Sequence, residues 1–215
     1  MNRPATPSDP APRPDAPADT ARTAVKQQRA LRTRTRILAA AAQLFADKGF
    51  PAVTIQDVAQ HADITKGAVY FHYANKEALA HAVANEFYAR IRDIADTIED
   101  KSLTPLSAVA ELLTRTAIAL RDDCVMQAGA RLQIERSMIT PELPTPFADY
   151  SDIITRWLHR GTQDGTLPSA TNPTALAQVL VSAFFGAQHI SWTLTNRADL
   201  PMRTHTIIQT VIPQI

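Results

Sequence analysis

The stretch TIQDVAQHADITKGAVYFHY, residues 54–73, predicts two short helices joined by a tight turn. Thr54 can cap the first helix, because a Thr followed three residues later by Asp57 satisfies backbone donors that the first turn leaves unpaired. Thr65 can cap the second helix, which would start at Lys66. The apolar Ile64 lies in the turn between them. The stretch is therefore a helical hairpin with a second helix too small to be a domain.

The apolar residues of each short helix predict its buried face. In the first helix Ile55, Val58 and Ala59 recur at helical spacing. In the second helix we expect the inward residues to be Ala68, Val69 and Phe71. Its leading or outward positions are Thr65, Lys66, Gly67, Tyr70 and His72. Such a helix suits insertion into the major groove of DNA, although a helical hairpin with a solvated polar face is an equal alternative on helix lengths alone.

The charge distribution favours DNA as the partner. The net charge of the 215 residues is only +1, but residues 22–80 hold nine Lys or Arg against four acids. Residues 81–215 hold eleven against fourteen. The basic end thus coincides with the helical hairpin, as expected if contacts to phosphates supply affinity. Arg29, Arg32 and Arg34 can reach phosphates or the minor groove beside the hairpin, and plain helix-surface charge is an equal alternative for each.

The second helix resembles a known recognition helix. TKGAVYFHY followed by Asn75, Lys76 and Glu77 is similar to the pattern T-x-G-x-[LIV]-Y-x-[HY]-[FY], polar residue, Lys, Glu of the TetR family of one-component repressors. The resemblance extends upstream through residues 36–50 and covers about residues 29–80. It implies a dimer that binds a double-stranded, near-palindromic operator. The candidate DNA contacts are Arg32, Arg34, Thr54, Gln56, Thr65, Lys66, Gly67, Tyr70, His72 and Lys76.

The remaining periodicity predicts an all-α chain with three parts. Residues 1–25 are Pro-rich and poor in large apolar residues, so we expect them to be disordered. Residues 26–75 form the three-helix helix-turn-helix domain, in which Gly49 caps the first helix. Residues 76–215 form a larger helical domain for ligand binding and dimerisation. We expect its helices over residues 76–99, 105–120, 123–138, 147–159, 173–195 and 200–212.

Two of these helices carry specific expectations. The helix over residues 76–99 is amphipathic and joins the DNA-reading domain to the larger one, so it can transmit a displacement between them. The helix over residues 173–195 is apolar on more than one side, which predicts burial against both its own domain and a symmetry mate. A two-fold homodimer agrees with the two half-sites of a palindrome. In the TetR family the last two helices form that interface.

A narrower resemblance points to a signalling ligand. Residues 121–134, the proline-rich segment 141–147 and residues 182–189 resemble the γ-butyrolactone receptors of antibiotic-producing actinomycetes and relatives that respond to butenolides or furan acids. The positions that line the pocket by this resemblance are Tyr88, Gln133, Phe147 and Tyr150, with Phe185, Gln188 and Trp192 as weaker candidates. Plain core packing is the alternative for all of them. Tyr150 stands where the group usually has Trp, and some furan-binding members have Tyr in place of Phe147.

The resemblance leaves the inducing molecule open. It can be a γ-butyrolactone, a butenolide, a furan acid or, as in the pseudo-receptors of the group, an antibiotic end product. A ligand-sequestering module that no longer reads DNA is a further alternative, which the basic helix and the Arg-rich segment before it argue against.

Other classes of protein lack support in the sequence. It contains no G-x-S-x-G, Walker or dinucleotide-binding motif, and its histidines form no zinc-binding set, so we expect neither an enzyme nor a metal or other cofactor. No apolar run reaches the length of a membrane span, and no leader is evident. The lone Cys124 suits a reducing compartment, and we expect a buried, unreactive thiol in a cytoplasmic protein.

Overall fold

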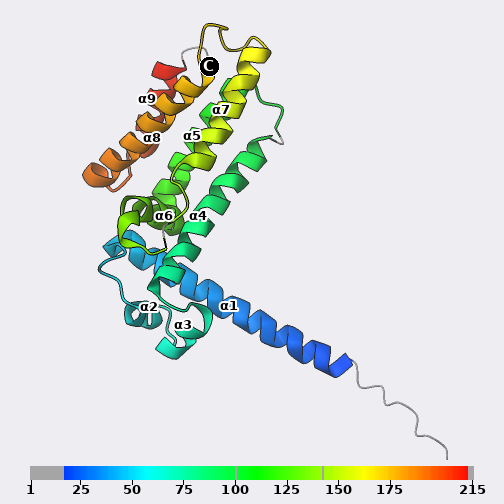
Figure 1. The fold of residues 1–215 in the computed structure, drawn as a ribbon, viewed down its shortest axis with the longest axis vertical. Coiled ribbons are helices and arrows are strands. Elements are labelled where there is room, and N and C mark those ends of the chain that lie inside the picture. Colours follow the sequence, from blue (N-terminus) through cyan, green and yellow to red (C-terminus); the bar gives the residue numbers. More distant parts are fainter. Residues whose placement is uncertain (1–16, 100, 142, 213–215) are drawn as a thin grey trace, which may run out of the picture. The chain divides into compact units, whose positions relative to one another are not determined.

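The computed structural model describes residues 17–99, 101–141 and 143–212 (Figure 1). The chain divides into two compact units, residues 1–36 and residues 37–215. The described residues form α-helices and one short 3-10 helix and contain no strand, so the prediction of an all-α fold is confirmed. The elements are α1 (Pro17–Lys48), α2 (Ile55–His61), α3 (Lys66–His72), α4 (Lys76–Glu99), α5 (Pro105–Asp122), α6 (Cys124–Ile134), η1 (Arg136–Met138), α7 (Ala148–Gln163), α8 (Pro173–Thr195) and α9 (Leu200–Val211).

The helix boundaries differ from expectation by more than two residues in three places. Helix α1 begins at Pro17, nine residues before the expected start. We expected residues 1–25 to be a disordered tail. Residues 1–16 lie outside the described residues, and residues 17–25 form the first turns of α1 instead. Helix α6 ends at Ile134, because the chain tightens there into η1. Helix α7 continues to Gln163 and ends beside Gly165, which has a φ of +78°.

Polar side chains begin α2, α3 and α4 as the sequence predicts. The Thr54 hydroxyl accepts from the Asp57 backbone N–H at 3.2 Å, while the Asp57 carboxylate accepts from the Thr54 N–H at 2.8 Å. Asn75 accepts from the Ala78 N–H at 2.7 Å and starts α4. Gly49 follows the last residue of α1 with a φ of +82°, a conformation that favours glycine and ends the helix.

Two apolar cores lie in the second unit. We call residues 37–75 the head and residues 101–212 the body, with α4 between them. The head core joins residues of α1, α2 and α3 to the first turns of α4, and it includes Phe45, Val58, Val69 and Leu79. The body core joins the rest of α4 to α5, α7, α8 and α9, and its largest buried side chain is Trp157.

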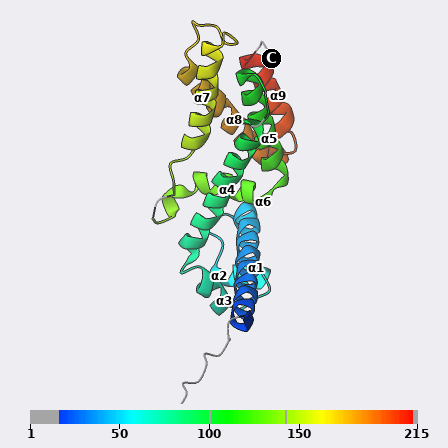
Figure 2. The ribbon, with the colours of Figure 1, turned by 90° about the vertical axis from the view of Figure 1, so that its right-hand side faces the viewer.

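Helix α6 contributes to both cores and crosses α4 (Figures 1 and 2). Val125, Ala128 and Leu132 belong to the head core, whereas Met126 and Ala130 belong to the body core. Gly129 allows the close approach, because a Cβ built on it would overlap the Phe87 ring of α4. The head is therefore tied to the body through two helices, α4 and α6, although the sequence predicted only α4 in this role.

Two smaller expectations can be compared with the structure. Cys124 is partly buried and packs against the head core. Among the described residues, no helix is long and apolar enough to cross a membrane.

Candidate functional site

Helices α2 and α3 form a compact helix-turn-helix. Asp63 in the turn has a φ of 51°, a left-handed conformation that Asp tolerates. Ile64 follows it, and its backbone N–H donates to the Ala59 carbonyl at 3.0 Å. Its side chain packs partly buried against the head core, and the Thr65 hydroxyl accepts from the Ala68 N–H at 3.2 Å. The turn therefore fixes α3 on α2 with an apolar contact and capped backbone ends.

The outer face of α3 differs from the prediction at one residue. Val69 is fully buried, and Lys66, Gly67 and Tyr70 are exposed as expected. Phe71, expected to point inward, is 81% exposed, so that prediction is wrong. The physical reason is helical geometry, since a residue two positions after Val69 is rotated by about 200° and faces away from the core. The Phe71 and His72 rings lie edge to face, with centroids 5.2 Å apart.

Of the other residues of the second unit predicted to contact DNA, one is exposed and three make contacts within the protein. Gln56 is exposed. The hydroxyls of Thr54 and Thr65 cap α2 and α3, and the Asp57 carboxylate that Thr54 contacts has its pKa lowered mainly by that hydroxyl. The Lys76 ammonium donates to the Phe50 carbonyl at 2.9 Å and lies 4.1 Å from the Phe50 ring centroid. Lys76 therefore holds the start of α4 against the head.

Arg32 and Arg34 belong to the first unit and lie on the N-terminal part of α1. Both side chains are exposed. The threonines beside them bond within the helix: the hydroxyls of Thr33 and Thr35 donate to the backbone carbonyls of Arg29 and Leu31 at 3.0 Å each. This segment thus presents its basic side chains from a regular helix, and their contact with DNA stays a prediction.

An ion pair at the end of α6 holds the end of α1, a role that no local pattern of residues predicted. Arg131 donates to the carbonyls of Ala46 and Asp47 at 3.0 Å each. Arg131 and Glu135 are 2.9 Å apart, and Glu135 also accepts from the Phe50 N–H at 2.7 Å. We call these two residues the α6 clasp. Since a cation and the carbonyls at a helix C-terminus attract each other, the clasp stabilises the junction between α1 and α6.

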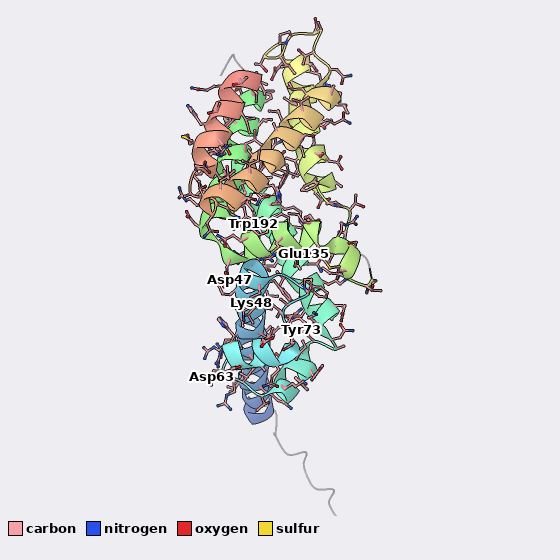
Figure 3. The ribbon with its side chains drawn as sticks, turned by 90° about the vertical axis from the view of Figure 1, so that its left-hand side faces the viewer. Asp47, Lys48, Asp63, Tyr73, Glu135 and Trp192 are labelled. Atoms are coloured by element: carbon pink, nitrogen blue, oxygen red, sulfur yellow. The ribbon has the colours of Figure 1, made fainter. Side chains whose placement is uncertain are left out.

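Trp192 of α8 covers the α6 clasp. The guanidinium of Arg131 lies 5.3 Å from the Trp192 ring centroid, and the guanidinium of Arg197 lies 4.9 Å from it. Burial and the neighbouring Arg131 charge lower the pKa of Arg197 to about 10. In Figure 3, Trp192, Glu135, Asp47 and Lys48 lie close to one another, and Tyr73 and Asp63 lie farther along the head. Trp192 therefore lies at the junction with the head, one turn beyond Gln188.

Tyr88 and Gln133, two residues predicted to bind a ligand, are paired inside the protein. The Tyr88 hydroxyl donates to the Gln133 side-chain carbonyl at 2.9 Å, and both residues are buried. Burial, with a smaller contribution from Asp149, raises the pKa of Tyr88 to about 12. The Gln133 amide nitrogen has no hydrogen-bond partner in the part of the chain that the structure describes. The Tyr88–Gln133 pair thus leaves the amide N–H donors of Gln133 unused in nonpolar surroundings.

Phe147, Tyr150 and Phe185 form an aromatic cluster with Phe184. The ring centroids of Phe147 and Phe185 are 4.3 Å apart, and those of Tyr150 and Phe185 are 5.5 Å apart. Phe147 precedes α7 with a φ of 62°, which is strained for an aromatic residue. The cluster joins the start of α7 to the middle of α8. Three of the seven predicted ligand contacts therefore lie together.

Several polar groups near these residues are buried without a partner. Among the described residues, the Tyr150 hydroxyl, the Thr116 hydroxyl and the Gln188 amide nitrogen make no hydrogen bond of ordinary geometry. Burial raises the pKa of Tyr150, and the Thr116 hydroxyl acts in the opposite direction, because the two hydroxyls lie near enough to interact although their geometry is not that of an ordinary hydrogen bond. Buried polar groups are normally hydrogen-bonded, so unpaired ones require an explanation such as a bound molecule. Sequence reasoning missed Thr116, which lies in an apolar helical run.

Two cavities of the described body lie apart from these residues. A groove of about 380 Å³ runs between α4 and α7 and is lined by Arg92, Asp96, Glu99, Asp149, Asp152 and Trp157, among others. Arg92 and Asp149 are 3.2 Å apart across it. A smaller apolar cavity of about 210 Å³ is lined by α5, α8 and α9 residues. Neither of these two cavities is lined by Tyr88, Gln133, Phe147 or Tyr150.

Comparisons with known families match both parts of the chain. The tetR family of bacterial regulatory proteins matches residues 37–83, and the tetracyclin repressor-like C-terminal domain matches residues 100–215. The A-factor receptor protein of Streptomyces griseus is 33% identical over 191 residues, covering 88% of this chain and 66% of the receptor. This chain thus spans just under two thirds of that receptor's length.

Solved structures agree with this assignment. A protein described in terms of the control of antibiotic production by bacterial hormones is 44% identical, with a TM-score of 0.80 over 85% of this chain and 97% of that one. A γ-butyrolactone receptor described as ArpA-like is 28% identical, with a TM-score of 0.68 over 87% of this chain and 100% of the other. The chain therefore belongs to the TetR family of bacterial regulatory proteins and is related within it to γ-butyrolactone receptors.

Proposed function

We propose that the protein is a transcriptional repressor that binds a near-palindromic DNA operator as a homodimer and is released by a small amphiphilic signalling molecule. The observation that carries the proposal is the outer face of α3, which exposes Lys66, Gly67 and Tyr70 on a helix held by the turn and the head core. A short, rigid helix with exposed donors is what direct readout in the major groove requires. The proposed contacts also include Gln56, His72 and the exposed Arg32 and Arg34 of α1.

A second copy of the chain is the proposed partner of α8 and α9. Val179, Ile190 and Leu194 of α8 are 53%, 47% and 68% exposed, and Met202 of α9 is 64% exposed. Large apolar side chains exposed on adjacent helices favour burial against another molecule. A two-fold dimer would cover them and would present two heads to two half-sites.

The proposed ligand site lies among the unpaired polar groups of the body core. Gln133 and Gln188 offer amide donors, and the hydroxyls of Tyr150 and Thr116 can donate or accept. The aromatic cluster supplies the apolar surface beside them. A lactone, butenolide or furan acid carries ring oxygens or a carboxylate that accept such bonds, and an antibiotic with equivalent acceptors would serve as well. Because Tyr150, Thr116, Gln133 and Gln188 are buried, side chains around them would have to move for the molecule to enter.

The proposed release mechanism uses both helices that join the body to the head. A ligand against Tyr88 and Gln133 would act on α4 and α6 directly, because these residues belong to those two helices. Gln133 is two residues from Arg131, which holds the end of α1. A ligand that prefers one arrangement of these helices shifts the population toward it, and the spacing of the two heads changes.

The experiment that tests the repressor function is an electrophoretic mobility shift with the full chain and the promoter region beside its own gene. The expected result is a sequence-specific complex that weakens steeply as salt rises, since phosphate contacts release counterions. Lys66→Ala should weaken that complex, whereas Arg121→Ala, which removes a surface ion pair with Asp122, should not. Absence of any specific complex would contradict the repressor function and favour a ligand-sequestering module.

The ligand is tested by adding purified γ-butyrolactones, butenolides, furan acids and a culture extract to the same complex. Release by one class identifies the signal. Gln133→Ala should then require a higher concentration of that molecule while binding the operator normally. If none of the additions releases the DNA, the proposed induction step is wrong.

A further inference from the structure

Phe71 is the outermost large apolar side chain of α3. Its exposed fraction is 81%, the highest among the large hydrophobic residues found exposed in the described chain. Val69, two positions earlier, is fully buried. A residue rotated by about 200° from a buried one contributes no packing to the head core. Stability of the head therefore does not explain an aromatic ring at this position.

The surroundings of Phe71 leave its ring free to meet a flat surface. Gly67 lies one turn earlier on the same face, and a Cβ there would meet only the Thr65 hydroxyl, at 4.0 Å. The helix backbone can therefore approach a groove closely at this point. Tyr70, 47% exposed, and Lys66 lie on the adjacent face, with the Lys66 ammonium 5.9 Å from the Tyr70 ring centroid. The edge-to-face His72 ring restricts the positions that Phe71 can adopt.

The base edges in the major groove offer one apolar group. Each base pair presents ring nitrogens, carbonyls or amino groups, and thymine adds a C5 methyl. A phenyl ring placed over the polar groups would remove water from them without replacing its hydrogen bonds. Placed against the thymine methyl, it buries apolar surface on both sides.

We propose that Phe71 is a specificity-determining residue that contacts the C5 methyl group of a thymine in each operator half-site. The inference deepens the proposed function and rests on it, because it requires α3 to lie in the major groove. It assigns the hydrogen-bonding contacts to Lys66, Tyr70 and His72 and the selection of a methyl group to Phe71. The operator should therefore contain a thymine whose methyl group alone affects binding.

Replacement of thymine by deoxyuridine tests this directly, because it removes the methyl and leaves every hydrogen-bonding group of the base in place. Duplexes that bind the full chain are first selected from a random pool. Each thymine of the selected operator is then replaced singly, and dissociation constants are measured at one fixed salt concentration. Wild-type protein should lose about fourfold in affinity at one thymine per half-site, as expected for loss of one buried methyl.

The Phe71→Ala variant completes the test. It should bind the operator and its uracil-substituted form equally well, since the group that senses the methyl is gone. Ile118→Ala is the matched control, because Ile118 is an apolar residue on α5 that is 42% exposed. It should keep the wild-type sensitivity to uracil. Both variants should unfold at the wild-type temperature, which separates loss of contact from loss of fold.

The possible results have distinct meanings. If no uracil substitution weakens binding, or if Phe71→Ala keeps the full uracil penalty at every position, the assignment to Phe71 is overturned while the repressor function stands. If the full chain selects no duplex from the pool, the proposed function fails and the inference fails with it.

Discussion

The head and the body of the second unit differ in how their polar side chains are paired. In the head, the side chains of Thr54, Asp57 and Thr65 pair with backbone N–H groups at helix starts. In the body, Thr116, Gln133, Tyr150 and Gln188 each keep a buried polar atom without a partner. A group of the first kind stabilises the protein as it stands, whereas a group of the second kind costs free energy until something binds it. The difference supports the two proposals, a preformed DNA-binding surface on the head and a ligand site in the body.

These two regions meet where α6 crosses α4 at Gly129. Gly129→Ala should have the largest effect on stability of the substitutions proposed. The added methyl would overlap the Phe87 ring where α6 crosses α4, so the free energy of unfolding should fall by about 3 kcal/mol. Urea unfolding followed by circular dichroism measures this loss. Gly67→Ala is the control, since its methyl would enter open space and should leave stability unchanged or slightly higher. Equal effects of the two substitutions would show that the crossing has room to adjust.

Arg131→Ala should give the next largest effect. It leaves the carbonyls of Ala46 and Asp47 without their donor and Glu135 without its cation, which should cost about 2 kcal/mol. Hydrogen exchange should speed up around residues 45–50, at the end of α1, and remain slow in α8. Arg121→Ala should leave both measurements at their wild-type values. Uniform acceleration over the whole body would mean that the α6 clasp has no local role at the head.

Thr54→Ala tests the paired polar groups of the head, because it removes the hydroxyl that caps α2. The substitution should lower the free energy of unfolding by about 1 kcal/mol, the usual cost of losing such a cap. Thr97→Ala is a suitable comparison, because the Thr97 hydroxyl only donates to a carbonyl of its own helix on the surface. Thermal unfolding should show a lower midpoint for Thr54→Ala than for Thr97→Ala. A wild-type midpoint for Thr54→Ala would mean that the reciprocal bonds between Thr54 and Asp57 contribute little to stability.

Thr116→Val tests an unpaired polar group of the body, and it should raise the free energy of unfolding where the previous substitutions lower it. Replacing the unpaired hydroxyl by a methyl of similar size should raise stability by about 1 kcal/mol or less. Thr204→Val is the matched control, because the buried Thr204 hydroxyl donates to the Leu200 carbonyl at 2.9 Å. That variant should lose stability or show no change. Destabilisation by both would indicate that the Thr116 hydroxyl already has a partner, such as bound water.

The smallest expected effect is a pH dependence of the head. Hydrogen bonds from Thr54 lower the pKa of Asp57 below its ordinary value of 3.8. The ionised carboxylate therefore stabilises the folded state fully above that ordinary value, and this contribution disappears as the pH falls through the lower folded-state pKa. The stability difference between wild type and Asp57→Asn should accordingly be constant near pH 6 and shrink as the pH approaches 2. A difference that grows with acid would contradict the assigned sign.

The sequence predicted the head better than the body for a physical reason. The caps at Thr54, Thr65 and Asn75 depend on residues three positions apart, so the sequence alone reveals them. The exception is Phe71, where apolar character suggested burial and the rotation of the helix placed the ring outside. The helices of the body followed from periodicity, and the start and end of α8 were predicted at the residues observed.

Contacts between distant residues were beyond what the sequence could predict. Arg131 and Glu135 look like an ordinary surface pair four residues apart, and nothing local shows that they meet the end of α1. Gly129 likewise appears as one small residue in a helix until α4 is placed against it. The resemblance to γ-butyrolactone receptors gave the ligand candidates, of which Trp192 lies at the junction and Phe147, Tyr150 and Phe185 lie together.

Gly49 carries a consequence for how related sequences can diverge. Its φ of +82° disfavours any residue with a side chain, and a Cβ there would also meet the ends of Arg131 and Glu135. A lineage that replaces this glycine must therefore alter α6 as well. Among homologues that keep Gly49, the arginine and the glutamate should persist together, and those that lose it should lose the pair. Covariation of Gly49 with two positions more than 80 residues later in the chain would then record the junction in sequences alone.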